Sequence, residues 1–148
     1  MSEREVLARF EAQLDPVRPE AAPGVAIIGY GEVSTVFGLA ELPGRVCKRM
    51  AGFRDAEAVA HYAETVRRYI DFLEAEDIRV VETAILAIER KGLAPVVYLA
   101  QPQLAAEGLG NSVLRHADDA TLRARLDAVL LRIGRLLRSN RERRDGRS

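Results

Sequence analysis

Two features of this sequence could act on a phosphate group. The first is a glycine-rich segment made of Gly29, Tyr30, Gly31, Glu32, Val33 and Ser34. Glycines lack side chains, so backbone N–H groups there can approach phosphate oxygens closely. The second is Lys48, whose compact ammonium can contact phosphate oxygens as a point charge. Together they predict a phosphate site, although a tight turn and an edge-strand lysine that limits sheet aggregation are the ordinary alternatives.

Lysine is rare in this chain, which makes Lys48 stand out. The 148 residues include 20 arginines but only two lysines, Lys48 and Lys91. An ammonium and a planar guanidinium differ in chemistry, so a lysine in a protein that otherwise uses arginine can mark a specific need. Chance placement is the alternative. The position of Lys48, in a strand that follows the glycine-rich segment, favours the functional interpretation.

Other catalytic and metal-binding chemistries find little support in the sequence. His61 and His116 are far apart and have no cysteine or acidic cluster at metal-ligand spacing, so we expect no metal site. Cys47 has no base partner and is interpreted as a small buried side chain. No G-x-S-x-G nucleophile motif occurs. We therefore assign no catalytic residue and no metal ligand.

The spacing of apolar residues predicts the elements that would position these features. A helix is expected over 4–14, followed by a proline-rich connector over 15–24. Short strands are expected over 25–29, 33–39, 45–50, 78–88 and 95–100. Between the third and fourth strands, a helix over 55–76 is expected, capped by Asp55. Beyond the strands, we expect a short helix near 112–116 and a long final helix capped by Asp118 or Asp119.

The predicted order is β-β-β-α-β-β followed by helices. This order indicates an α+β fold, with a five-stranded antiparallel sheet and one long packed helix, followed by C-terminal helices. We divide the chain into an N-terminal helix and connector (1–24), the sheet lobe (25–103), a helical region (104–140) and a charged tail (141–148).

The motifs in this order resemble the N-lobe of kinase-like phosphotransferases, the superfamily of protein kinases and of aminoglycoside and choline phosphotransferases. The resemblance rests on GYGEVSTVF, then VCKRM, a long helix, two strands and a hinge-like YLAQPQL. The segment EDIRVVET looks more like the small-molecule phosphotransferase branch. The similarity covers roughly Val25 to Asn140. One departure is Ser34, which replaces the third glycine of the pattern G-x-G-x-x-G-x-V.

The resemblance implies a nucleotide site for Mg-dependent ATP. The backbone of 29–34 would cover the phosphates, and Lys48 would hold the α- and β-phosphates. The backbone from Gln101 to Gln103 would form the hinge that reads the adenine edge, and Val36 and Leu104 would sandwich the base. Kinase-like proteins pair this lysine with a helix glutamate, for which Glu64 is the candidate by separation. At 100° per residue, however, Glu64 points away from the apolar stripe of its helix, so a solvated surface position is the alternative.

The family's catalytic loop and its metal-binding aspartate have no counterpart before the chain ends. We therefore expect a nucleotide-binding, kinase-like protein or fragment that does not transfer phosphate as this chain alone. Its C-lobe could be a separate chain. The alternative is a non-catalytic interaction module, in which a pseudokinase-like lobe self-associates or binds a protein partner. The apolar side of the final helix around Leu126, Leu130, Ile133 and Leu137 would then be exposed.

The composition of the chain also limits which other partners and which location are expected. Charges balance at 22 basic and 22 acidic residues, so no overall field directs the chain to nucleic acid or to a membrane. No apolar run approaches the ~18 residues that a membrane span needs, and the N-terminus lacks a signal-peptide core. With a single cysteine, a cytoplasmic location is expected. The arginine-rich end is interpreted as a solvated helix face, so nucleic acid is not a favoured partner.

Overall fold

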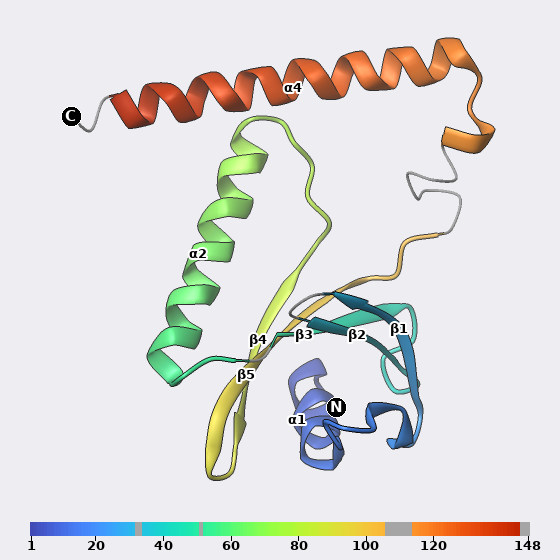
Figure 1. The fold of residues 1–148 in the computed structure, drawn as a ribbon, viewed down its shortest axis with the longest axis vertical. Coiled ribbons are helices and arrows are strands. Elements are labelled where there is room, and N and C mark those ends of the chain that lie inside the picture. Colours follow the sequence, from blue (N-terminus) through green and yellow to red (C-terminus); the bar gives the residue numbers. More distant parts are fainter. Residues whose placement is uncertain (32–33, 51, 106–113, 146–148) are drawn as a thin grey trace. The chain divides into compact units, whose positions relative to one another are not determined.

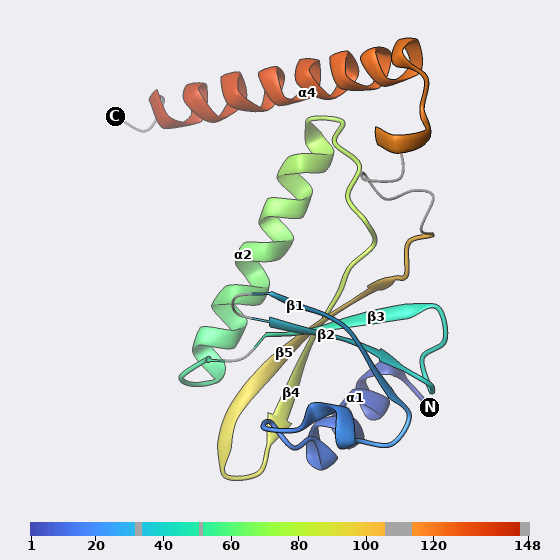
Figure 2. The same cartoon turned by 45° about the vertical axis from the view of Figure 1, so that its right-hand side comes forward.

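The core of the fold is a five-stranded antiparallel sheet with the strand order β1-β2-β3-β5-β4 (Figures 1 and 2). The computed structural model describes residues 1–31, 34–50, 52–105 and 114–145. The strands are β1 (Val25–Gly31), β2 (Ser34–Leu39), β3 (Arg45–Met50), β4 (Ala84–Arg90) and β5 (Leu93–Pro102). With the long helix α2 and the helical C-terminal region, this confirms the predicted fold class.

One face of the sheet, the α1 face, is covered by helix α1 (Glu3–Gln13) (Figure 2). Ser2 caps this helix in a capping box with Glu5, so the helix starts where the chain first offers a cap. The ring of Phe10 lies 5.1 Å from that of Phe37 and 6.3 Å from that of Tyr98, measured between centroids. The apolar core of the molecule therefore lies between α1 and this face.

The opposite face, the Lys48 face, carries the alternate residues of each strand. Val97 belongs to it and is fully buried. Helix α2 (Ala56–Ala75) starts on this side of the sheet, opposite α1 in both views (Figures 1 and 2). Its buried residues are Val59 and Ala63. Asp55 caps the helix as predicted, because its Oδ1 accepts a hydrogen bond of 2.8 Å from the Ala58 N–H.

The strand expected over 78–88 is shorter than predicted and begins only at Ala84. Helix α2 ends at Ala75, Asp77 then adopts the left-handed conformation, and the Ile78 N–H donates back to the Leu73 carbonyl. The chain then covers 79–83 without a hydrogen-bonded neighbouring strand. β-branched residues such as Val80 form a strand only when a partner strand is within reach.

Residues group into two units along the chain. The first comprises Met1–Val66 and Val81–Gln103, and the second comprises the described parts of Arg67–Val80 and Leu104–Ser148. Helix α4 (Asp119–Asp145) belongs to the second unit and contains no buried residue. Asp118 caps it, since its Oδ1 accepts a 2.9 Å hydrogen bond from the Thr121 N–H.

Helix α4 corrects one sequence-based boundary. The charged tail was expected from 141 onward, but the helix continues to Asp145, and Arg143 places its guanidinium 4.4 Å from the centre of the Phe72 ring. Through this cation–π contact, the C-terminal end of α4 has a partner within its own unit. Of the short helix expected near 112–116, residues 114–116 are helical and 112–113 lie outside the described residues.

Candidate functional site

The register of the sheet places Lys48 in a row with the glycine-rich hairpin. Gly29 lies opposite Val36, Val36 opposite Lys48, and Lys48 opposite Leu99. Residues directly opposite each other on antiparallel strands point to the same face. The side chains of Val36, Lys48 and Leu99 therefore share one surface, which ends at the backbone of Gly29.

Lys48 is half-buried, and its surroundings in the described part of the chain are apolar. Among the described residues, its ammonium forms neither an ion pair nor a hydrogen bond with another side chain. Its neighbours across the sheet, Val36 and Leu99, are apolar. A cation beside apolar side chains gains free energy from an anionic partner more than a fully solvated one does, because nearby protein lowers the local dielectric.

The structure does not bring Glu64 to Lys48. Glu64 is exposed on α2, and no ion pair joins it to Lys48 in the part of the chain that the structure describes. The side of α2 that is buried presents Val59 and Ala63 instead. Glu64 directly follows Ala63, and this 100° step turns the carboxylate off the buried side.

The glycines of the hairpin differ in what they are needed for. A Cβ on Gly31 would lie 2.9 Å from the Ser34 Oγ, so a side chain there would require the Ser34 hydroxyl to shift. A Cβ on Gly29 would meet no atom within 4 Å. Packing therefore does not explain Gly29, whereas open space above the backbone is what an approaching ligand needs. Tyr30 is exposed, and Glu32 and Val33 lie outside the described residues.

The predicted hinge is partly used by the sheet itself. Gln103 donates its backbone N–H to the Gly44 carbonyl over 2.8 Å. Pro102 has no N–H to offer. Gln101 lies on the Lys48 face, and its side-chain amide donates to the Thr83 hydroxyl over 2.8 Å. At Gln103 and Pro102 no backbone donor is therefore left for an adenine edge. Leu104, expected to cover the base with Val36, is exposed and belongs to the second unit.

Comparison with known sequences gives a family but no activity. The model of DUF6206, a family of unknown function, matches residues 21–147. The chain belongs to this family. No curated protein and no solved structure matches it. In the described helices of this DUF6206 chain, no segment is both long and apolar enough to cross a membrane.

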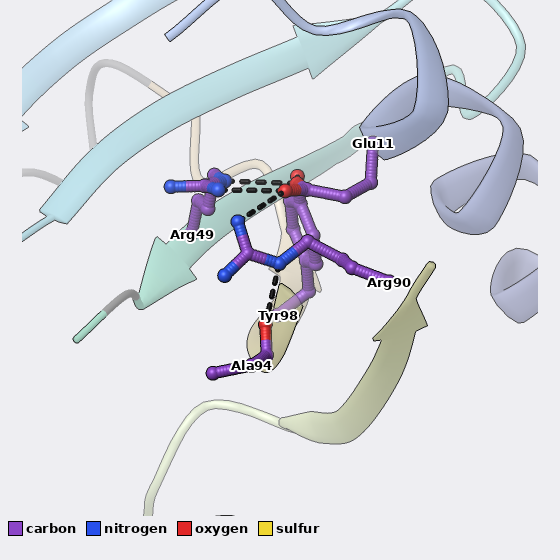
Figure 3. Close-up of polar contacts among 5 residues, drawn as sticks. All are labelled: Glu11, Arg49, Arg90, Ala94 and Tyr98. Atoms are coloured by element: carbon purple, nitrogen blue, oxygen red, sulfur yellow. Dashed lines mark hydrogen bonds and ion pairs between the residues drawn. The ribbon is translucent and has the colours of Figure 1, made fainter. Parts of the chain in front are cut away.

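The α1 face of the DUF6206 chain holds a buried polar cluster that the sequence analysis missed (Figure 3). Glu11 of α1, with its side chain 4% exposed, accepts two hydrogen bonds from Arg49, of 2.8 Å from Nε and 2.6 Å from Nη2. The Tyr98 hydroxyl donates to the same carboxylate over 2.5 Å. Arg90 places Nη1 3.6 Å from Glu11 and donates its Nε to the Ala94 carbonyl over 2.6 Å.

Opposing influences act on the carboxylate of this cluster. Burial raises the pKa of Glu11. The hydrogen bonds from Arg49 and Tyr98 and the charges of Arg49 and Arg90 together lower it by more, so the pKa of Glu11 lies below its ordinary value. Burial and the hydrogen bond to Glu11 raise the pKa of Tyr98. Glu11 therefore stays ionised and Tyr98 stays protonated at neutral pH, which is the combination that the hydrogen bonds require.

The cluster is one end of a ladder between α1 and β3. Four residues of helix rise by about 6 Å, close to the ~6.8 Å spanned by two residues of a strand. The matching residues are Glu3, Leu7 and Glu11 on α1, and Arg45, Cys47 and Arg49 on β3. Arg45 Nε lies 2.9 Å from Glu3 Oε1 as an ion pair without hydrogen-bond alignment. A sequence signal existed, because Glu11 falls within the apolar stripe of Leu7 and Leu14.

Cys47 lies between the two ion pairs of the ladder and is completely buried. Burial and the nearby charge of Glu3 raise the pKa of its thiol to about 11. Thiolate is the reactive form of cysteine, so this thiol is unreactive at neutral pH. The structure thus agrees with the sequence interpretation of Cys47 as a small buried side chain.

Proposed function

We propose that this DUF6206 chain binds ATP or a related nucleotide with Mg²⁺ on the Lys48 face. The observation that carries the proposal is the row from Gly29 through Val36 to Lys48 across three adjacent strands. A ligand lying along this row would have open glycine backbone at one end and a lysine ammonium two strands away. Backbone N–H groups and a lysine are the elements with which kinase-like folds hold nucleotide phosphates.

The pairing pattern of β3 supports a ligand at Lys48. The two arginines of this strand, Arg45 and Arg49, point to the α1 face and form ion pairs with glutamates of α1. Lys48 points the other way and has no such pair among the described residues. Among the described residues of β3, Lys48 is thus the cation for which a phosphate could serve as the partner.

The proposal concerns binding and not transfer. Phosphoryl transfer in protein kinases uses a catalytic aspartate followed five residues later by an asparagine that binds metal. The two asparagines of this sequence are Asn111 and Asn140. Five residues before them stand Ala106 and Arg135, so neither asparagine has an aspartate at that spacing. The exposed position of Glu64 also leaves Lys48 without the glutamate that orients it in active kinases.

Titration with a fluorescent ATP analogue, with and without Mg²⁺, tests the proposal. The chain offers a matched control, because its other lysine, Lys91, lies exposed in the turn between β4 and β5. We expect Lys48→Ala to raise the Kd about tenfold, the value of one charge-assisted hydrogen bond. Lys91→Ala should leave the Kd unchanged.

Three results would contradict nucleotide binding at this face. They are no binding at millimolar nucleotide, equal losses in the Lys48 and Lys91 variants, and binding that is indifferent to Mg²⁺. Circular dichroism of each variant separates lost affinity from lost folding.

A second candidate function is a non-catalytic interaction module. It is favoured by the apolar residues of α4, which are exposed although apolar side chains gain free energy on burial. Under this alternative the sheet is a scaffold, and α4 contacts a second copy or another protein. Binding of nucleotide and binding through α4 would use different units, so the two functions can be tested separately.

A further inference from the structure

Helix α4 carries a continuous apolar stripe. Seven apolar residues lie between positions 122 and 137, within an arc of about 120° at 100° per residue. They are Leu122, Leu126, Val129, Leu130, Ile133, Leu136 and Leu137. Five of them are between 41% and 64% exposed, with Leu130 the most exposed. Single exposed leucines are ordinary, but a contiguous stripe of this length marks a contact surface.

The contacts that α4 makes in its own unit leave this stripe uncovered. Arg132 lies 3.6 Å from Asp77, and Arg143 lies over the Phe72 ring. At 100° per residue, Arg132 and Arg143 fall within about 20° of each other, at one edge of the stripe. These two contacts with the end of α2 therefore lie at the arginine edge, and five of the seven stripe residues stay exposed.

The charges beside the stripe indicate what could cover it. Between 122 and 141, the helix carries six arginines and one aspartate, a net charge of +5, although the whole chain is neutral. Arg125 and Arg132 border one edge of the stripe, and Arg123 and Arg141 border the other. A second α4 packed on this surface would bring a further +5 against it, which opposes self-association.

We infer that the stripe of α4 docks an amphipathic helix of another protein, with apolar residues at its centre and acidic residues along its edges. Leucine-like side chains would pack between Leu126, Leu130 and Ile133, as in helix pairs. Glutamates or aspartates at its edges would pair with Arg123 and Arg125. Charges beside a helical seam select the partner in this way, whereas the apolar contacts supply most of the affinity.

A synthetic acidic helix tests this directly against the full chain. The probe is a 28-residue heptad peptide with Ile and Leu at the two core positions and Glu at both flanking positions, a pattern that cannot pair with itself at neutral pH. Anisotropy of the labelled peptide measures its affinity. The helix itself supplies matched controls, because Leu131 is an exposed leucine and Arg138 an exposed arginine on the opposite side.

We expect one peptide to bind per chain, with an affinity that falls as the salt concentration rises. Leu130→Ser should weaken binding about tenfold, as expected for one leucine lost from an apolar contact. Leu131→Ser should leave the affinity within about twofold of the parent chain. Arg125→Glu should weaken binding about fivefold or more, and Arg138→Glu should have a smaller effect.

Several outcomes would overturn the inference. The labelled peptide could show no rise in anisotropy when the chain is at 100 times the peptide concentration, or the Leu131 and Arg138 variants could lose as much affinity as the Leu130 and Arg125 variants. Light scattering could show a dimer that Leu130→Ser dissociates, which would make a second copy the occupant. Sedimentation with vesicles of anionic lipid, but no peptide binding, would make a lipid surface the occupant.

Discussion

The two faces of strand β3 treat positive charge in opposite ways. On the α1 face, Arg45 and Arg49 are covered by a helix and meet glutamates, and Arg49 is held by a two-pronged hydrogen bond. On the other face, Lys48 sits between the apolar Val36 and Leu99, and it forms no ion pair with a residue that the structure describes. Neighbouring positions of one strand thus serve two purposes, because side chains alternate between faces.

The choice of side chain follows the same division. A planar guanidinium can donate two parallel hydrogen bonds to one carboxylate, as Arg49 does to Glu11. An ammonium lacks this fixed fork but can adjust to phosphate oxygens as a point charge. The two faces therefore differ in a way that can be tested: the cations of the α1 face pair with glutamates, whereas Lys48 pairs with no described anion. The predictions below test that division.

The largest expected effect is on the α1 face. Glu11→Ala would leave Arg49 and Tyr98 buried without their shared acceptor. We expect a loss of about 3 kcal/mol in the free energy of unfolding, as for other broken buried ion pairs. Urea unfolding followed by circular dichroism measures it. Lys48→Ala is the control and should change the free energy by less than about 0.5 kcal/mol. Equal losses would remove the proposed division between the faces.

The pH dependence of unfolding gives a second test of the same cluster. The pKa of Glu11 is lowered in the folded chain from its ordinary value of 4.5. Its contribution is therefore fully present above pH 4.5 and is lost as the pH falls through the lower, folded-state value. Urea midpoints between pH 6 and pH 2 should fall more steeply for the parent chain than for Glu11→Gln. Parallel curves for the two proteins would show that the Glu11 carboxylate contributes no such stability.

The smallest effect is expected at Glu64 on α2. Its side chain is exposed and pairs with no described residue, so Glu64→Ala should change the free energy of unfolding by less than about 0.5 kcal/mol. The same variant should bind the ATP analogue as the parent chain does. A loss of affinity that matches the loss in Lys48→Ala would show that Glu64 orients the lysine when nucleotide is bound. Lys48 and Glu64 would then act as the lysine–glutamate pair of kinase-like folds.

Much of the sheet was predictable from local pattern. The predicted bounds of β3 agree with the structure, and Asp55 caps α2 where a capping residue precedes an apolar stripe. The start of β4 was not predictable in this way. Residues 78–83 are rich in β-branched side chains, yet they form no ladder, because a strand needs a hydrogen-bonded neighbour as well as propensity.

In the candidate site too, some features follow from local pattern and others depend on contacts between distant segments. Alternation along β2 and β3 was enough to predict that Val36 and Lys48 are near the glycine hairpin. Helical periodicity was enough to indicate that Glu64 points off the apolar stripe. The engagement of the Gln103 N–H by Gly44 was not predictable, because it depends on where the turn before β3 meets the end of β5. The Glu11 cluster joins residues up to 87 positions apart and has only a faint local signal.

The sequence by itself determined the order of strands and helices and the Asp55 cap of α2, since these follow from neighbours a few residues apart. It also determined that Lys48 and Arg49 point to opposite faces of one strand, because that follows from the twofold alternation of β-structure. Only the tertiary structure decided which of the two would find a carboxylate. That outcome depends on α1 packing on this face of the sheet so that Glu11 reaches Arg49, and contacts between distant segments are set by packing of the whole core rather than by any local pattern.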